Sequence, residues 1–230
     1  RKEHAFFADG VQDDVLTKLA KVADLKVISR TSVMQYRGKQ DLREIGSALG
    51  VSHVLEGTVR PYNEKVHVNA RLVDTRTGTD VWGEEYDRDL KDIFAIEAEL
   101  TQAVANQLQA SISTGEMLAV QERPTHDLIA YDLFTRAKTL SSSTTFGNPT
   151  TPQKLLQAVD LLNQAVARDP SFFLAYFQLA HTDDLLYFLG NDHTPVRLAM
   201  AEAAVQTASQ LRPHAGEAHL ARGENLYWGH

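Results

Sequence analysis

The sequence predicts a small α+β domain, a mixed sheet packed with helices, followed by an all-α array of helical hairpins. Three observations support this. Helix and strand patterns alternate as far as about residue 114, nearly everything after about residue 126 reads as helical, and two helical segments repeat each other 43 positions apart. We therefore expect domains at 1–114 and 126–230, joined by a linker over 115–125.

The composition is that of an ordinary globular protein and narrows the possible functions. The chain has 230 residues, 43% of them hydrophobic, and a net charge of −7. Its basic residues are scattered singly, which disfavours nucleic-acid binding, because phosphate contacts need clustered Lys and Arg. The absence of cysteine excludes disulfides and thiol chemistry. We recognise no membrane span and no signal peptide, so the cytoplasm and the outer side of a membrane both stay open.

The first domain begins with helical and strand signals in alternation. Asp9 and Gly10 precede apolar residues at helical spacing, which predicts a helix with an acidic first turn. Residues 25–29 are rich in β-branched side chains and predict a short strand. Residues 41–49 predict a second helix that ends at Gly50.

Three meandering strands and a long helix complete the first domain. Strict alternation of apolar and polar residues is typical of a half-buried antiparallel strand. The predicted elements are, in order, a strand at 51–60, a turn at 63–64, a strand at 66–72, a turn at 75–78, a strand at 80–86 and a helix at 89–112.

The second domain is predicted from the internal repeat. The positions paired 43 residues apart are Ala158 with Ala201, Ala165 with Ala208, Pro170 with Pro213, and Ala175 with Ala218. Small residues let helices pack closely, and proline separates one hairpin from the next. Tetratricopeptide (TPR) repeats have this pattern with a period of about 34 residues. The longer spacing predicts an insertion, which we place at 190–195.

Two further stretches of the helical domain lead to expectations. The polar stretch 141–152 is too rich in helix-breaking residues to be helical. Residues 218–228 read as the first helix of a hairpin whose second helix is absent from the sequence. We therefore expect the natural chain to continue, and this last helix to expose a face through which the chain could self-associate.

Aromatic residues in the helical domain are candidates for partner binding. TPR surfaces hold a protein or peptide partner, and exposed aromatic side chains would anchor it. The predicted partner-binding residues are Phe173, Tyr176, Phe177, Tyr187, Tyr227 and Trp228.

Three polar clusters invite chemical hypotheses, although a structural role is the more economical explanation for each. The first cluster, Asp9, Asp13 and Asp14, is either a cation site or a set of charges favoured at a helix start. The second, Glu84, Glu85, Asp87 and Asp89, is either an acid–base pair or a solvated strand edge. The third is His181 with Asp183 and Asp184, a candidate metal site or acid–base pair. The known phosphate-loop, dinucleotide, zinc and serine-nucleophile motifs are absent from the sequence. We expect no catalytic, cofactor-binding or metal-binding residue, no cofactor, and no enzyme activity within this stretch.

Motifs spread over the first domain carry a family resemblance. They are Phe-Ala-Asp-Gly at 7–10, Leu-Lys-Val-Ile-Ser-Arg-Thr-Ser at 25–32, Ile-Gly-Ser-Ala-Leu-Gly-Val at 45–51, Val-Leu-Glu-Gly-Thr-Val-Arg at 54–60, Arg-Leu-Val-Asp at 71–74, Thr-Gly-Thr-Asp-Val-Trp at 77–82, Tyr-Asp-Arg at 86–88 and Asp-Ile-Phe at 92–94. In this order they resemble the TolB-like amino-terminal module of bacterial signalling proteins, over about residues 5–112. Helical repeats behind such a module are a common pairing.

The resemblance implies a role beside an effector, such as a winged-helix regulator, a Ser/Thr kinase or a class III nucleotide cyclase. The family module begins with a strand ending in a Leu-Pro-Phe-like motif that this sequence lacks, so we expect the sheet to be one strand short. The family supplies no catalytic residue to carry over.

Three functions follow from these observations. The leading hypothesis is a non-enzymatic interaction and signal-input module of a larger bacterial regulatory protein. The alternative is a small-molecule sensor that controls an attached effector, with a pocket near Arg30, Tyr36 and Trp82. The third is a hydrolase or transferase, which would require a cleft with perturbed titratable groups.

Overall fold

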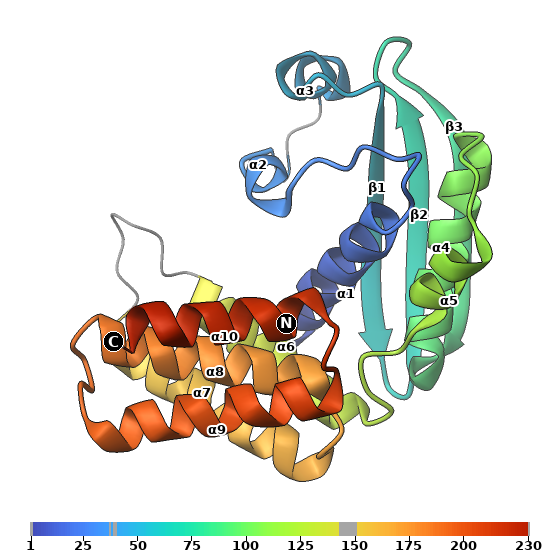
Figure 1. The fold of residues 1–230 in the computed structure, drawn as a ribbon. Helices are drawn as coiled ribbons and strands as arrows, with labels where there is room; N and C mark the ends of the chain where they lie inside the picture. Colours follow the sequence, from blue (N-terminus) through green and yellow to red (C-terminus); the bar gives the residue numbers. More distant parts are fainter. Residues whose placement is uncertain (1, 37, 39–40, 143–150, 230) are drawn as a thin grey trace. The chain divides into compact units, whose positions relative to one another are not determined.

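The computed structural model describes residues 2–36, 38, 41–142 and 151–229, and the chain divides into two compact units (Figure 1). The first unit is Arg1–Glu122 and the second is Arg123–His230. Each unit has its own core. Across the described ranges, no helix is long and apolar enough to cross a bilayer.

A three-stranded antiparallel sheet forms the centre of the first unit. Its strands are β1 (His53–Tyr62), β2 (Lys65–Asp74) and β3 (Thr79–Asp89), in the order β1-β2-β3. The central strand β2 buries alternate side chains, including Val66, Val68 and Ala70, as the alternation in its sequence predicts. The turn between β1 and β2 contains Asn63 with a positive φ of 52°, which Asn tolerates better than most residues.

Helices cover the sheet and complete the unit. They are α1 (Lys2–Ala20), α2 (Arg30–Met34), α3 (Leu42–Leu49), the 3₁₀ turn η1 (Leu90–Asp92), α4 (Ile93–Gln107) and α5 (Thr114–Gln121). α1 and α4 pack against each other and against the sheet, α1 over β1 and α4 over β3 (Figure 1). The predicted α3 is present with both caps, since Asp41 accepts two backbone hydrogen bonds at its start and Gly50 adopts φ 66° at its end.

Four details of the first unit differ from the sequence prediction. Residues 25–29 form no strand, so the described sheet is antiparallel rather than mixed. α1 begins at Lys2 rather than near Asp9. The long helix predicted to reach residue 112 ends at Gln107, because Gln109 has a φ of 56° and the chain turns.

The fourth difference lies in the stretch expected to be a linker. Residues 114–121 form helix α5. A capping box starts this helix: Ser113 accepts a hydrogen bond from the Glu116 backbone, and the Glu116 side chain bonds back to Ser113. The polar residues that cap the start of α5 therefore look, in the sequence alone, like a break between helices.

The described residues of the second unit form an array of five helices. These are α6 (Leu128–Ser142), α7 (Pro152–Arg168), α8 (Phe173–Phe188), α9 (Pro195–Leu211) and α10 (Gly216–Trp228). Each helix packs on the next, and α10 also packs on α8 (Figure 1). The repeated alanines lie at these contacts, since Ala158, Ala165, Ala201 and Ala208 are all fully buried. The helical array predicted from the repeat is thus present, while residues 143–150, part of the predicted polar stretch, lie outside the described residues.

Candidate partner-binding face of the helical array

One ridge of helix α8 stays partly open, while most of the remaining side chains of the helix are buried. Its side chains recur every three or four residues, so they lie on one face of the helix. They are Leu174, Phe177, His181, Leu185 and Phe188. The last of these is 49% exposed, which is unusual for a phenylalanine.

Helix α10 continues this ridge through residues 43 positions later in the repeat. Leu220, Glu224 and Trp228 are the equivalents of Phe177, His181 and Leu185. The Glu224 carboxylate Oε2 lies 2.9 Å from Nδ1 of His181. The Trp228 ring stacks on Phe188, with centroids 5.6 Å apart, and meets the His181 ring at the same distance. We name these eight residues of α8 and α10 the α8–α10 face.

A polar layer lies beside this face among α8, α9 and α10. Arg197 Nη1 donates to Asp183 at 2.6 Å, and the same guanidinium bonds Asp192 through Nη2 at 2.8 Å. Asn225 donates to Oδ1 of Asp184 at 2.8 Å, linking α10 to α8. Asp184 is fully buried, and its second oxygen has no hydrogen-bond partner. Burial raises the pKa of Asp184 to about 6, and the charges of Glu224 and Asp183 add to the shift.

Two of the predicted partner-binding residues, Phe177 and Trp228, lie on the α8–α10 face. Tyr227 is 79% exposed, beside that face on α10. Phe173 is only 1% exposed and packs in the core with Ala208 and Ala218, so it supports the fold. Its ring is also covered by the guanidinium of Arg212 at 5.0 Å.

The other two predicted contacts, Tyr176 and Tyr187, are not members of this face. Tyr176 is half-buried and packs against the Phe173 cluster. Tyr187 stacks on His193 with ring centroids 3.9 Å apart, in the connection between α8 and α9.

The sequence interpretation missed six of the eight members of the face. Those not among the predicted contacts were Leu174, His181, Leu185, Phe188, Leu220 and Glu224. The 43-residue repeat contains a signal for two of them, because shifting Phe177 and His181 by one repeat gives Leu220 and Glu224. For Phe188, nothing in the sequence distinguishes an exposed end of α8 from a buried one.

The acidic residues at the start of the chain have a different setting from the one expected. Asp9, Asp13 and Asp14 lie within α1, not at its first turn, so a favourable interaction with the helix start does not explain them. Asp14 instead acts on the core, since its charge helps to raise the pKa of the buried Glu97.

The second acidic run lies along β3, an edge strand of the described sheet. Its carboxylates are exposed and pair locally: Asp87 accepts from the Tyr62 hydroxyl at 2.6 Å, and Glu85 accepts from the Asn69 amide at 3.0 Å. This is the solvated strand edge that the sequence favours over a catalytic pair.

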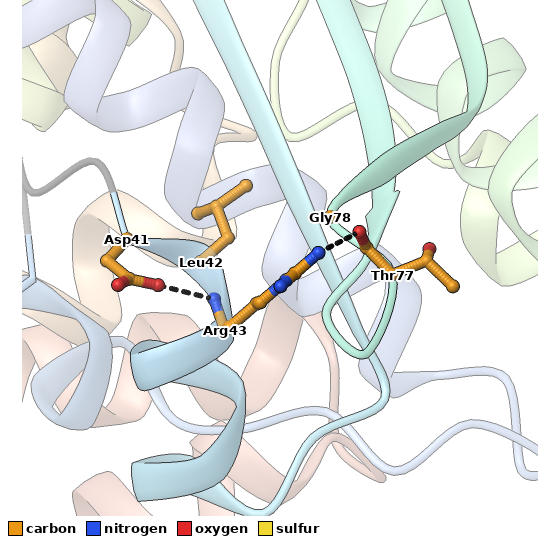
Figure 2. A pocket seen from close by; sticks show the side chains of 5 residues that line it. All are labelled: Asp41, Leu42, Arg43, Thr77 and Gly78. Carbon is orange, nitrogen blue, oxygen red and sulfur yellow. Dashed lines mark hydrogen bonds between the residues drawn. The ribbon is translucent and has the colours of Figure 1, made fainter.

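A shallow, solvent-open hollow of about 460 Å³ lies between the start of α3 and the turn joining β2 to β3. Figure 2 shows Arg43 reaching across it to the Thr77 carbonyl, which its Nη2 contacts at 2.6 Å. Asp41, Leu42 and Gly78 complete the lining. Arg30, Tyr36 and Trp82, where the sequence suggested a ligand pocket, are not part of it.

The remaining sequence candidate for metal binding was His181 with Asp183 and Asp184. The structure separates their contacts, since His181 pairs with Glu224, Asp183 with Arg197 and Asp184 with Asn225. Within the described ranges, no group of three or more His, Asp or Glu side chains could hold a metal ion.

These features define a chain with an α+β unit and a helical array that offers an aromatic and acidic face. No protein-family model matches the chain. It is 33% identical, over an alignment 237 positions long, to a protein of Rhizobium meliloti (strain 1021) named "Putative adenylate cyclase 3". The alignment covers 98% of this chain but only 38% of that relative's length. The similarity agrees with a regulatory or signalling role for this chain.

The same comparison contradicts the prediction that this stretch has no enzyme activity. The relative is named as a cyclase, and its aligned region includes almost the whole of this chain. The prediction was wrong because it rested on the absence of short motifs. Such motifs test only for the chemistries that they encode, and a cyclase needs none of those considered.

Proposed function

We propose that the helical array is a TPR-type module that binds a protein or peptide partner through the α8–α10 face. The single observation that carries this is the partly exposed row of mainly apolar side chains on α8 and α10 that ends in the Phe188–Trp228 stack. Aromatic anchors with a polar neighbour such as Glu224 are typical of binding hot spots. The role of this contact is signal input to a regulatory protein related to the R. meliloti relative.

In this proposal the first unit is a TolB-like module. Two observations support this assignment: the order of its motifs along the chain, and the meander of β1, β2 and β3 beneath α1 and α4. Several motif residues have structural roles. Gly46 packs against Thr75, and Gly78 adopts a φ of 74° in the turn before β3.

A photo-crosslinking experiment tests partner binding. A benzophenone amino acid placed at Phe188 in the full-length protein should yield adducts in cells of the source organism, and mass spectrometry identifies the partner. The matched control is the same amino acid at Ile129 of α6, which is also exposed (56%) but lies outside the α8–α10 face. The purified partner should then bind the wild-type protein more than about tenfold more tightly than a Phe177→Ala variant, as for a hot-spot residue. Equal adducts at both positions would refute the proposal.

A second candidate function is adenylate cyclase activity, which the name of the relative supports. In that reaction the 3′ oxygen of ATP attacks the α-phosphorus, and pyrophosphate leaves as cyclic AMP forms. The purified chain and the full-length protein are assayed side by side with Mg²⁺ or Mn²⁺. Cyclic AMP from the chain alone would establish the activity within these residues. Product from the full-length protein alone would assign it to the longer protein.

Sensing of a small molecule is a third candidate, and the hollow beside α3 favours it. Its lining includes the Arg43 guanidinium and the Asp41 carboxylate, both at the start of α3. A ligand there should raise the unfolding temperature of the wild-type protein and leave that of an Arg43→Ala variant unchanged. The absence of such a ligand in a screen of cell metabolites would count against sensing at this hollow.

A further inference from the structure

The polar layer beside the α8–α10 face holds more negative than positive charge. It contains four carboxylates, Asp183, Asp184, Asp192 and Glu224, which are held by three separate groups of hydrogen bonds. The cationic groups in this layer are the guanidinium of Arg197 and, when protonated, the imidazole of His181.

The positive charge is distributed unevenly over these carboxylates. Arg197 is shared between Asp183 and Asp192, and His181 contacts Glu224. The partner of Asp184 is the neutral amide of Asn225, which leaves Oδ2 of Asp184 without a hydrogen bond. An ionised carboxylate that is buried with one oxygen unsatisfied is costly, and a cation that reached it would offset much of that cost.

Aromatic rings surround His181, one helical turn before Asp184. Trp228 meets the ring of His181, which precedes Asp184 by one helical turn, and it stacks on Phe188. Indole rings attract ammonium and guanidinium groups and also pack against the alkyl stems that carry them. Such surroundings suit an organic cation better than a bare metal ion, for which the described residues offer no ligand set.

We propose that the partner bound at the α8–α10 face inserts a basic side chain, Lys or Arg, whose cationic group pairs with Glu224 and with the open oxygen of Asp184. The side chain enters where His181 and Glu224 now meet, at a contact whose side chains are 30% and 20% exposed. It displaces His181 from Glu224, and its stem lies along Trp228. This inference rests on the partner-binding function proposed above and specifies the chemistry of that partner.

Support for the charge requirement comes from the ionisation of Asp184. Its pKa of about 6 means that the folded protein holds this group mostly ionised at neutral pH, although it is buried. The charged groups that face it are Asp183 and His181 on α8 and Glu224 on α10. Two of these three groups, Asp183 and Glu224, are carboxylates. An incoming cation is therefore attracted by more than one carboxylate.

Tryptophan fluorescence gives a direct test. In a Trp82→Phe background, Trp228 is the one tryptophan left in the sequence. The probe is acetyl-Leu-Arg-Leu-amide, and its control is the same peptide with citrulline, which has nearly the same shape but no charge. At neutral pH and low salt we expect a saturable fluorescence change with the arginine peptide and at least about tenfold weaker binding of the citrulline peptide, as for a desolvated charge contact.

A matched pair of variants locates the cation. Asp184→Asn should weaken binding of the arginine peptide to the level of the citrulline peptide. Asp160→Asn, at an exposed aspartate of α7, changes the net charge equally and should leave binding unchanged. Circular dichroism confirms that each variant is folded. Should Asp184→Asn not fold, the comparison of the two peptides on the Asp184 protein still decides the outcome.

The results separate this inference from the function on which it rests. Equal binding of the two peptides, or full binding of the arginine peptide to Asp184→Asn, would overturn the inference. If crosslinking at Phe188 nevertheless identifies a partner, the proposed function stands and the partner uses other chemistry. Specific crosslinking together with a preference for arginine supports both.

Discussion

Lys18 and Glu97 lie close enough in the core of the first unit to shift each other's pKa, yet the hydrogen bonds of Lys18 go elsewhere. Its ammonium donates to the carbonyls of Val120 at 2.6 Å and Glu122 at 3.1 Å, at the end of α5. Both carboxyl oxygens of Glu97 are buried without a hydrogen-bond partner. Burial raises the pKa of Glu97 well above its usual range, and the charge of Asp14 adds to this effect, while Lys18 opposes it.

Replacing Glu97 with Gln should stabilise the first unit at neutral pH. Because the folded-state pKa of Glu97 is raised, folding takes up a proton, and stability is lost as the pH rises above the unfolded value of 4.5. The Gln variant should lose this pH dependence and gain on the order of 1 kcal/mol near neutral pH. Urea unfolding followed by Trp82 fluorescence in a Trp228→Phe background measures it. Glu99→Gln is the control, since Glu99 is exposed and pairs with Arg88 on the surface. A Gln variant with an unchanged pH profile would contradict this assignment.

Replacing Lys18 with Met should release α5 from α1. The substitution keeps the apolar stem but removes two hydrogen bonds of a charged donor, at a cost of about 1–3 kcal/mol. Hydrogen exchange in residues 114–121 should accelerate more than elsewhere in the unit. Lys21→Met is the matched control, because the exposed Lys21 makes a single 3.2 Å bond to the Ala119 carbonyl of the same helix. If both variants accelerate exchange equally, Lys18 has no special role in holding α5.

The accuracy of the sequence prediction follows from how local each signal is. Helix α3 could be predicted because Asp41 and Gly50 define its ends within ten positions of chain, and both caps are present. The strand predicted at 25–29 failed because a short apolar run has no period that separates a strand from an extended connection. Whether such a run joins a sheet depends on a neighbouring strand, which the run itself does not encode.

The candidate site shows the same limit at longer range. The aromatic residues of α8 were visible in the sequence, but Phe173 turned inward and Phe188 outward, because packing by α9 and α10 decides which face is covered. The pairing of Asp184 with Asn225 joins residues 41 positions apart. No local sequence pattern predicts such a contact. The unsatisfied oxygen of Asp184 therefore could not be predicted either.

Replacing Gly46 with Ala should destabilise the first unit. An added Cβ would come within 3 Å of Thr75, whose hydroxyl is held by the carbonyls of Val51 and Ser52 and therefore cannot easily move. Such overpacking costs about 1–3 kcal/mol. Gly46 thus keeps α3 against the end of β2. Ser47→Ala, at the next and exposed position of the same helix, should change stability by less than about 0.5 kcal/mol. The urea midpoints of the two variants compare their stabilities. A Gly46→Ala variant as stable as the wild type would disprove the close contact.

Replacing Asp184 with Asn should remove the loss of second-unit stability that this group causes as the pH rises through the mildly acidic range. The pKa of Asp184 is raised from 3.8 to about 6 by burial, so the folded state binds a proton more tightly than the unfolded state. Stability from this group is fully present below the unfolded value and is lost as the pH rises through about 6, by an amount on the order of 2 kcal/mol. The Asn variant should keep its hydrogen bond with Asn225 and show no such loss.

Urea unfolding between about pH 4 and about pH 7, followed by Trp228 fluorescence in a Trp82→Phe background, measures both profiles, with Asp160→Asn as the charge-matched control. A wild-type protein that loses no more stability than the Asn variant as the pH rises would show that the charge of Asp184 is compensated in the free protein. The need for a cation from the partner would then disappear.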